Sequence, residues 1–123
     1  MIRVAILFLI TLNSALVFGQ EAEFSLDEKV HKFPKTKEGV LLEHNFQITN
    51  TGDAPLLISD YRVNCTCTKV ELPEAPILPG ATYSLKVTFD TNGKYDFQDR
   101  TVYLKTNTKK GSETIRFKVR VID

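Results

Sequence analysis

Two cysteines, Cys65 and Cys67, carry the most distinctive chemistry of this sequence, because one residue separates them and no other cysteine occurs. Thiols at this spacing support three kinds of chemistry. They can form a small disulfide or a reversible thiol pair, since residues i and i+2 of an extended strand point the same way with Cα atoms near the upper limit for a disulfide. They can also pack as two small apolar side chains, or bind a soft metal ion such as copper(I). The residues alone leave all three open.

A copper site would need further ligands, because two thiolates leave coordination positions to fill. His44 is a candidate, so Cys65, Cys67 and His44 form the possible metal set. His44 shares a predicted strand face with apolar residues, however, which favours a hydrogen-bonded histidine of the core or its rim over a ligand. His31 lies near a predicted strand end and is expected to be solvated. We therefore predict no cofactor, with copper as the alternative.

No arrangement typical of catalysis is found in the sequence. The Gly-x-Ser-x-Gly, His-Glu-x-x-His and glycine-rich phosphate-binding motifs are absent. Asp90, Asp96 and Asp99 gather around a predicted turn and are expected to be solvated loop residues. A domain of this size also offers little cleft for a polysaccharide. We predict that the protein is not an enzyme.

The first nineteen residues have the pattern of a secretory signal peptide. A short basic start is followed by an apolar run from Val4 to Phe18, about 15 residues, whereas a membrane span needs roughly 20. Cleavage is expected after Gly19, with Ala22 as second choice, and no cysteine follows the run to carry a lipid anchor. The prediction is a signal peptide over 1–19 and one domain over 20–123. The protein would then be periplasmic or extracellular and would not span the membrane after cleavage.

The charge balance argues against two classes of partner. The whole chain has 16 Lys and Arg and 15 Asp and Glu. Arg3 is the only charged residue in the predicted signal peptide, so the remaining domain is neutral. No long run of like charge occurs, which argues against nucleic acid or an anionic membrane as partner. A protein of the cell envelope is the expected partner.

Apolar and polar residues alternate along most of the predicted domain, which is the period of half-buried strands. The clearest strands are expected at 42–49, 56–63, 83–89, 101–105 and 114–121, with a weak first strand over 23–33 and a polar connector over 35–39. Turns are predicted at 50–53, 91–94 and 107–112. The expected core residues are Phe46, Ile48, Leu85, Val87, Phe89, Val102, Leu104, Phe117 and Val119.

Three prolines between positions 73 and 79 are incompatible with a central strand, so this segment is expected to cross between layers at an edge. About seven strands with turns every 8–12 residues predict an all-β fold, namely an immunoglobulin-like Greek-key β-sandwich.

Several short motifs resemble a bacterial family of secreted Ig-like domains, domain of unknown function 1573, which is common in Bacteroidetes. They occur in the family's order over nearly the whole predicted domain. Two departures are visible: Thr66 stands where the family usually has glycine between the cysteines, and Tyr95-Asp96 replaces a later glycine. The resemblance implies the fold and the compartment and carries no established activity. The motifs are His31-Lys32-Phe33-Pro34, Lys37-Glu38-Gly39, His44-Asn45-Phe46, Asn50-Thr51-Gly52-Asp53-Ala54-Pro55-Leu56, Asn64-Cys65-Thr66-Cys67-Thr68, Pro76-Ile77-Leu78-Pro79-Gly80 and Thr106-Asn107.

Together these features predict an exported, non-catalytic Ig-like module with a protein-interaction or structural role in the cell envelope. The alternative is a periplasmic thiol-redox or copper-handling protein that uses Cys65 and Cys67.

Overall fold

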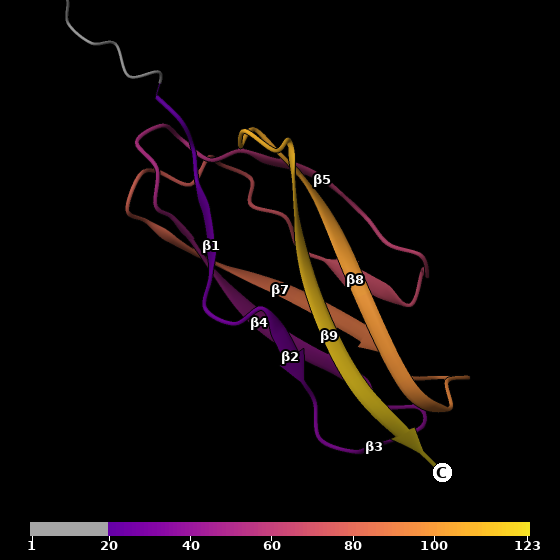
Figure 1. Cartoon of the computed structure of the whole chain (residues 1–123). Helices are drawn as coiled ribbons and strands as arrows, with labels where there is room; N and C mark the ends of the chain where they lie inside the picture. The colour runs from indigo at the N-terminus through magenta and orange to yellow at the C-terminus, as the bar shows by residue number, and fades with distance from the viewer. Residues whose placement is uncertain (1–19) are drawn as a thin grey trace, which may run out of the picture.

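The computed structural model describes residues 20–123, which form nine β-strands in two facing sheets (Figure 1). The predicted signal peptide and its cleavage site after Gly19 lie outside or at the boundary of the described residues. Within residues 20–123 there is no helix of the length and apolar character needed to cross a membrane. The strands are β1 (Phe24–Leu26), β2 (Val30–Lys32), β3 (Thr36–Lys37), β4 (Leu41–Asn50), β5 (Ile58–Arg62), β6 (Thr68–Val70), β7 (Thr82–Asp90), β8 (Asp96–Thr106) and β9 (Ser112–Ile122).

The strand order confirms the predicted immunoglobulin-like β-sandwich. One sheet has the order β1-β4-β7-β6, and the other has the order β2-β9-β8-β5 with β3 also paired to β9. Neighbouring strands are antiparallel except that β2 and β3 run parallel to β9. This order, with one early strand shared between the sheets, is that of a constant-type Ig sandwich.

The first strand is divided between the two sheets, which, together with the short strands β3 and β6, explains why nine strands are found where about seven were expected. β1 pairs with β4, the chain then crosses over Asp27–Lys29, and β2 pairs with β9 in the opposite sheet. Pro34 has no N–H to donate, and pairing resumes only at β3. The predicted polar connector over 35–39 was therefore wrong in part, because it contains β3.

The proline-rich segment was expected to cross between layers, and that expectation was wrong. It joins β6 to β7, which are neighbours in the same sheet. The crossing instead takes place between β5 and β6, over residues 63–67, where both cysteines lie. Ile77 within the proline-rich segment forms an isolated bridge with Leu56 and is buried.

All nine predicted core residues are buried between the sheets. They were predicted from the alternation of apolar and polar residues, because every second side chain of a half-buried strand points inward. Phe117 of β9 packs edge-on against Phe89 of β7, with ring centroids 5.2 Å apart, and against Phe33, at 5.9 Å. The contact with Phe89 joins the two sheets in the core, whereas Phe33 lies beside β9 in the same sheet as Phe117.

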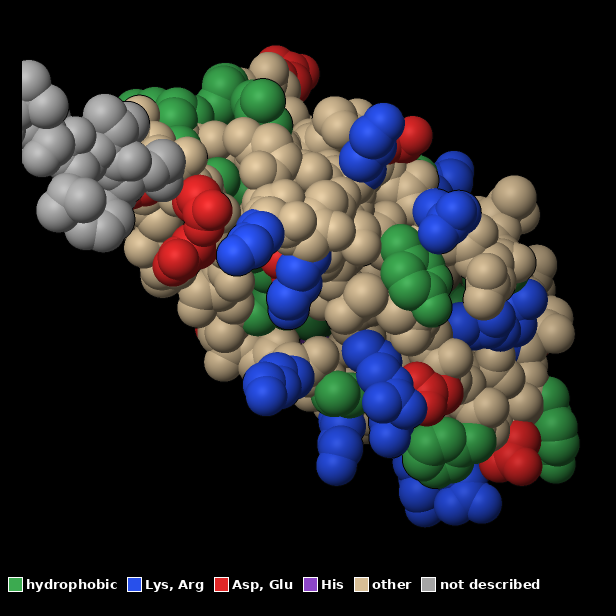
Figure 2. Space-filling model, turned by 45° about the horizontal axis from the view of Figure 1, so that its top comes forward, with side chains coloured by type: hydrophobic (Ala, Val, Ile, Leu, Met, Phe, Trp, Pro, Cys, Tyr) green, Lys and Arg blue, Asp and Glu red, His purple; other side chains and the backbone are tan. Residues whose placement is uncertain are grey.

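Charged side chains are mixed over the surface. In the face that Figure 2 shows, Lys and Arg are interleaved with acidic and hydrophobic side chains. Two of the ion pairs join β8 to β9: Arg116 with Asp99, and Arg120 with Asp96. Exposed pairs of this kind contribute little to stability.

Replacing Phe117 by alanine should destabilise the protein by roughly 3–5 kcal/mol, because a buried aromatic side chain is lost and a cavity is left. The measurement is the free energy of unfolding in denaturant. Phe97→Ala is the matched control, since Phe97 is 65% exposed and should change stability by less than about 0.5 kcal/mol. Equal effects of the two substitutions would mean that the inward face of β9 is wrongly assigned.

Candidate functional site

Cys65 and Cys67 are joined by a disulfide in the connection that crosses between the sheets. Their Cα atoms are 5.1 Å apart, well inside the usual range for disulfides. The separation is shorter than that of an extended strand because the two residues lie in a turn. The N–H of Thr68 donates to the C=O of Cys65 at 3.2 Å, and the N–H of Asp90 donates to the C=O of Cys67 at 2.9 Å.

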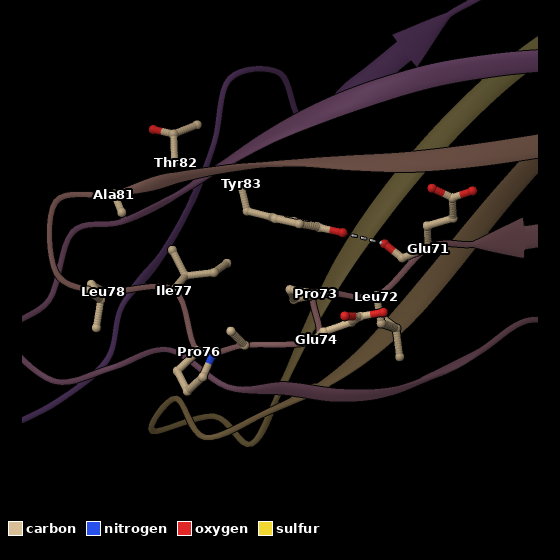
Figure 3. Close-up of a pocket in the computed structure, with 11 residues that line it drawn as sticks. Glu71, Leu72, Pro73, Glu74, Pro76, Ile77, Leu78, Ala81, Thr82 and Tyr83 are labelled. Atoms are coloured by element: carbon tan, nitrogen blue, oxygen red, sulfur yellow. Dashed lines mark hydrogen bonds between the residues drawn. The ribbon is translucent and has the colours of Figure 1, made fainter.

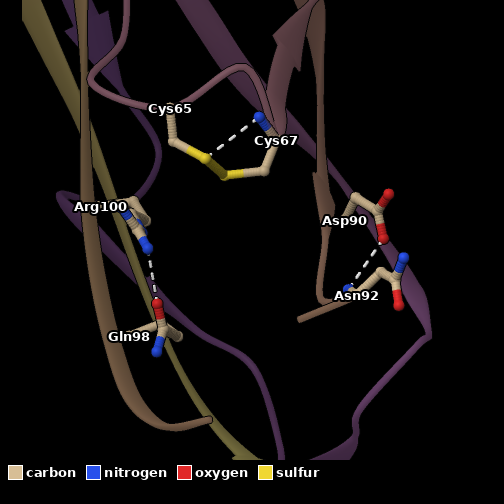
Figure 4. The surroundings of a disulfide bond; sticks show 6 residues. All are labelled: Cys65, Cys67, Asp90, Asn92, Gln98 and Arg100. Carbon is tan, nitrogen blue, oxygen red and sulfur yellow. Dashed lines mark hydrogen bonds between the residues drawn. A yellow bond between two sulfur atoms is a disulfide. The ribbon is translucent and has the colours of Figure 1, made fainter. Parts of the chain in front are cut away.

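Figure 4 shows polar side chains near the disulfide, including the cation Arg100, while Cys67 itself packs against the hydrophobic core. Arg100 of β8 places its guanidinium 5.5 Å from the ring centre of Phe89, and its Nη2 donates to Gln98 Oε1 at 2.6 Å. Its Nε is buried without a hydrogen-bond partner among the described residues. Both cysteines are half-buried and the residue between them is exposed. If the bond were reduced, a nearby cation would favour the thiolate form.

The structure brings His44 together with His31 and Glu28. His44 lies on the inward face of β4, His31 belongs to β2 in the opposite sheet, and Glu28 lies in the crossing between β1 and β2. The two imidazole rings stack with centroids 3.5 Å apart and planes 10° from parallel. Glu28 Oε1 lies 2.5 Å from His31 Nδ1 and 3.0 Å from His44 Nε2.

Burial lowers the pKa of His44, and the neighbouring His31 lowers it further, while Glu28 and Asp27 act in the opposite direction. The contact from His44 Nε2 to Glu28 Oε1, at 3.0 Å, also raises the pKa of His44, and no other side chain among residues 20–123 bonds this buried nitrogen. The arrangement therefore favours a neutral imidazole at His44.

The sequence analysis placed His44 correctly at the rim of the core but missed the cluster. The expectation of a solvated His31 was wrong, since its side chain is 21% exposed and stacked on His44. A Glu28–His31 spacing of three residues was the only local signal. The copper site of Cys65, Cys67 and His44 stays a prediction. The two sulfurs are bonded to each other in this structure. Among residues 20–123, the side chains whose ligating atoms lie within reach of one ion are those of Glu28, His31 and His44.

A groove beside the beginning of β7 is a further candidate site that the sequence analysis missed (Figure 3). Its volume is about 820 Å³. Tyr83 extends across it, and its hydroxyl donates to the C=O of Glu71 at 3.1 Å. Burial raises the pKa of Tyr83, and the carboxylates of Glu71 and Glu74 raise it further. The other lining side chains are mostly apolar: Leu72, Pro73, Ala75, Pro76, Ile77, Leu78 and Ala81.

With the fold and these sites described, comparison with known proteins identifies the family. The family model described as protein of unknown function (DUF1573) matches residues 24–121. The chain belongs to this family. No curated protein matches it in sequence.

Solved structures share the fold of this DUF1573 protein. A Porphyromonas gingivalis W83 protein of unknown function superimposes with a TM-score of 0.72 at 16% identity, covering 86% of this chain and 50% of that one. The chain thus spans about half of that relative. The ASH/PapD-like domain 7 of human CEP192 gives 0.56 at 13% identity, covering 82% and 84%. The Vibrio cholerae VesB protease gives 0.60 at 14% identity, covering 84% and 32%. At these identities the likeness shows the fold alone.

Removing both sulfurs, in Cys65→Ser with Cys67→Ser, should lower the melting temperature by only a few degrees. Chain-entropy accounting for a three-residue loop gives about 1.6 kcal/mol at most, which corresponds to no more than about 8 °C for a domain of this size. The measurement is the melting temperature of the double variant by calorimetry, with Thr66→Ala, which keeps the disulfide, as the control. Outright unfolding of the double variant would show that the disulfide is structural.

Proposed function

We propose that this protein is an exported, non-catalytic module that binds another protein of the cell envelope by accepting an extended segment of that partner at the open edge of β7. One observation carries the proposal: backbone groups of β7 that have no backbone partner among residues 20–123 lie beside an apolar groove. An exposed strand edge is a template for strand addition, in which the backbone supplies affinity and neighbouring pockets supply specificity.

The backbone groups of β7 alternate between its two sides, as in any antiparallel strand. The N–H of Glu71 donates to the C=O of Lys86 at 2.9 Å, and the N–H of Asp90 donates at 2.9 Å to the C=O of Cys67, which directly precedes β6. The N–H and C=O groups of the even-numbered residues of β7 therefore face the β6 side. β6 ends at Val70, and its pairing with β7 stops at Val87. The N–H and C=O of Ser84 therefore point to an edge where no other backbone among the described residues bonds them.

The groove beside this edge defines the chemistry of the segment that would fit. Its walls are mainly apolar, with Leu78 62% exposed, and its charged side chains are both acidic, Glu71 and Glu74. Two carboxylates beside an apolar surface favour a partner segment that carries apolar side chains and a Lys or Arg. The proposed ligand is therefore an extended, basic and apolar peptide segment of an envelope protein.

The acidic residues considered for catalysis have local partners, which supports a non-catalytic role. Asp99 was expected in a loop, but it lies within β8 and pairs with Arg116 through two hydrogen bonds. Asp90 accepts a hydrogen bond from the N–H of Asn92 at 2.9 Å, which closes the turn after β7. Neither aspartate is positioned against a nucleophile or a second carboxylate in these contacts.

A thiol-redox role is the second candidate function, and Arg100 is the observation that favours it. A guanidinium near half-buried cysteines would stabilise a thiolate formed on reduction. Copper handling by Cys65 and Cys67 would likewise require the reduced form, because thiolates are the ligands. Exchange with glutathione, followed by a two-dalton change in intact mass, tests this role directly.

Site-specific photo-crosslinking in intact cells tests the main proposal. A photoreactive residue at position 78, in the groove, should give an adduct of defined mass in the envelope fraction. The same residue at position 41 is the matched control, because Leu41 and Leu78 are both 62% exposed and only Leu78 lines the groove.

A second substitution makes the adduct diagnostic of strand addition. Ser84→Pro removes the free N–H but no ladder hydrogen bond, since proline is tolerated where the N–H faces outward. It should reduce the position-78 adduct at least tenfold, whereas Ser84→Ala should preserve it. Equal adducts at positions 41 and 78, or an adduct that persists in a folded Ser84→Pro protein, would contradict the proposal.

A further inference from the structure

The cluster of Glu28, His31 and His44 is independent of the groove and of the disulfide, and its donor atoms converge. One oxygen of Glu28 and one nitrogen of each histidine all lie within 4.8 Å of one another. Both nitrogens approach the same carboxylate oxygen. We propose that Glu28, His31 and His44 bind a divalent transition-metal ion of the zinc class.

The donor set suits such an ion. Imidazole nitrogen and carboxylate oxygen are common ligands of zinc(II), and nickel(II) and copper(II) accept them too. Two histidines and one carboxylate leave a fourth position for water or a further ligand. The side chains of His31, His44 and Glu28 are 21%, 23% and 39% exposed, so water can reach that position.

The present distances are those of hydrogen bonds, and a metal ion requires a rearrangement of all three side chains. The imidazole rings must turn out of their parallel stack at 3.5 Å, because the lone pair of each nitrogen lies in its ring plane. Ligand atoms at about 2.1 Å from a tetrahedral ion lie about 3.4 Å apart, whereas Glu28 Oε1 is 2.5 Å and 3.0 Å from the two nitrogens. The carboxylate must therefore withdraw by about 1 Å to admit the ion. Glu28 is the most exposed of the three residues and lies outside the strands, so it can make this movement with least disturbance.

The histidines are prepared for the ion by their surroundings. His44 Nε2 is buried, and Glu28 Oε1, at 3.0 Å, is its polar neighbour among the described residues, so an ion at this point would be bound by both atoms. Glu28 supplies the negative charge that balances part of the ion's charge.

Binding should also stabilise the fold, because the ligands come from both layers. His31 belongs to β2, which pairs with β9, and His44 belongs to β4 in the opposite sheet. An ion held between them would connect the sheets at the side where the first strand crosses. An ion that binds only the folded state raises the melting temperature according to its concentration relative to the dissociation constant.

The test is titration of the exported protein, freed of metal by a chelator, with zinc chloride and separately with nickel chloride. Calorimetry should show one saturable site per chain, and at a hundredfold excess over the dissociation constant the melting temperature should rise by roughly 13 °C. Glu28→Gln and His31→Asn should each weaken zinc binding at least tenfold. Glu43→Gln, which alters an exposed carboxylate of β4, should leave binding unchanged.

The variants also distinguish this site from one that uses sulfur. Cys65→Ser with Cys67→Ser should bind zinc as the parent protein does. Absence of saturable binding, or binding that survives both Glu28→Gln and His31→Asn, would overturn the proposal, as would loss of binding in the double cysteine variant. If His31→Asn fails to fold, Glu28→Gln decides the matter alone, because it keeps the size of the side chain and removes only the anionic ligand.

Discussion

The side-chain amide of Asn50, at the end of β4, joins three segments of the chain by hydrogen bonds: the start of β1, the turn after β4 and the segment around Ile77. The positions of the candidate sites depend on these segments. Asn50 is fully buried. Its Nδ2 donates to the C=O of Ala54 at 2.7 Å and of Ile77 at 2.9 Å, and its Oδ1 accepts from the N–H of Gly52 at 2.9 Å and of Glu23 at 3.2 Å. One buried amide thus binds four backbone groups, through one buried hydrogen bond, to Ile77, and three partly buried ones. Its loss would leave polar groups at the edge of the core without a partner, which costs more than the loss of an exposed hydrogen bond.

Two of these hydrogen bonds have a consequence for a candidate site. The bond to Ile77, together with the bridge to Leu56, holds the proline-rich segment away from β7 and leaves the open edge and the groove. The bond to Glu23 fixes the start of β1 against β4, from which the chain crosses to place Glu28 and His31 over His44. Gly52 is needed here because a Cβ at this position would lie 2.1 Å from the C=O oxygen of Glu21. The turn over residues 50–53 therefore fixes the start of β1, at one edge of the sheet β1-β4-β7-β6, and the proline-rich segment that leads into β7.

Much of the fold could be predicted from the sequence, because alternation along β4, β7 and β9 reports which residues face inward, and these residues form the core. The sequence could not show that the first strand divides between the sheets, since each piece is only two or three residues long and has no period of its own. The histidine cluster could not be predicted either, because His31 and His44 meet across the two sheets and no local sequence pattern indicates such a contact. The cysteines were considered as residues of an extended strand, whereas they lie in a turn, where hydrogen bonds of Thr68 and Asp90 hold the backbone. The groove depends on where β6 ends, and composition does not determine that.

The most direct test of the central role of Asn50 is the free energy of unfolding of Asn50→Ala compared with that of Asn45→Ala. Both asparagines belong to β4, but Asn45 is exposed and Asn50 is buried. In Asn50→Ala the N–H of Glu23, the N–H of Gly52 and the C=O of Ala54 lose their hydrogen-bond partner among the described residues. The C=O of Ile77 keeps its hydrogen bond from the N–H of Leu56. We therefore expect a loss of about 2–3 kcal/mol, against less than about 0.5 kcal/mol for Asn45→Ala. A loss below about 1 kcal/mol for Asn50→Ala would mean that the turn, the start of β1 and the segment around Ile77 are held by other contacts, and it would contradict this account.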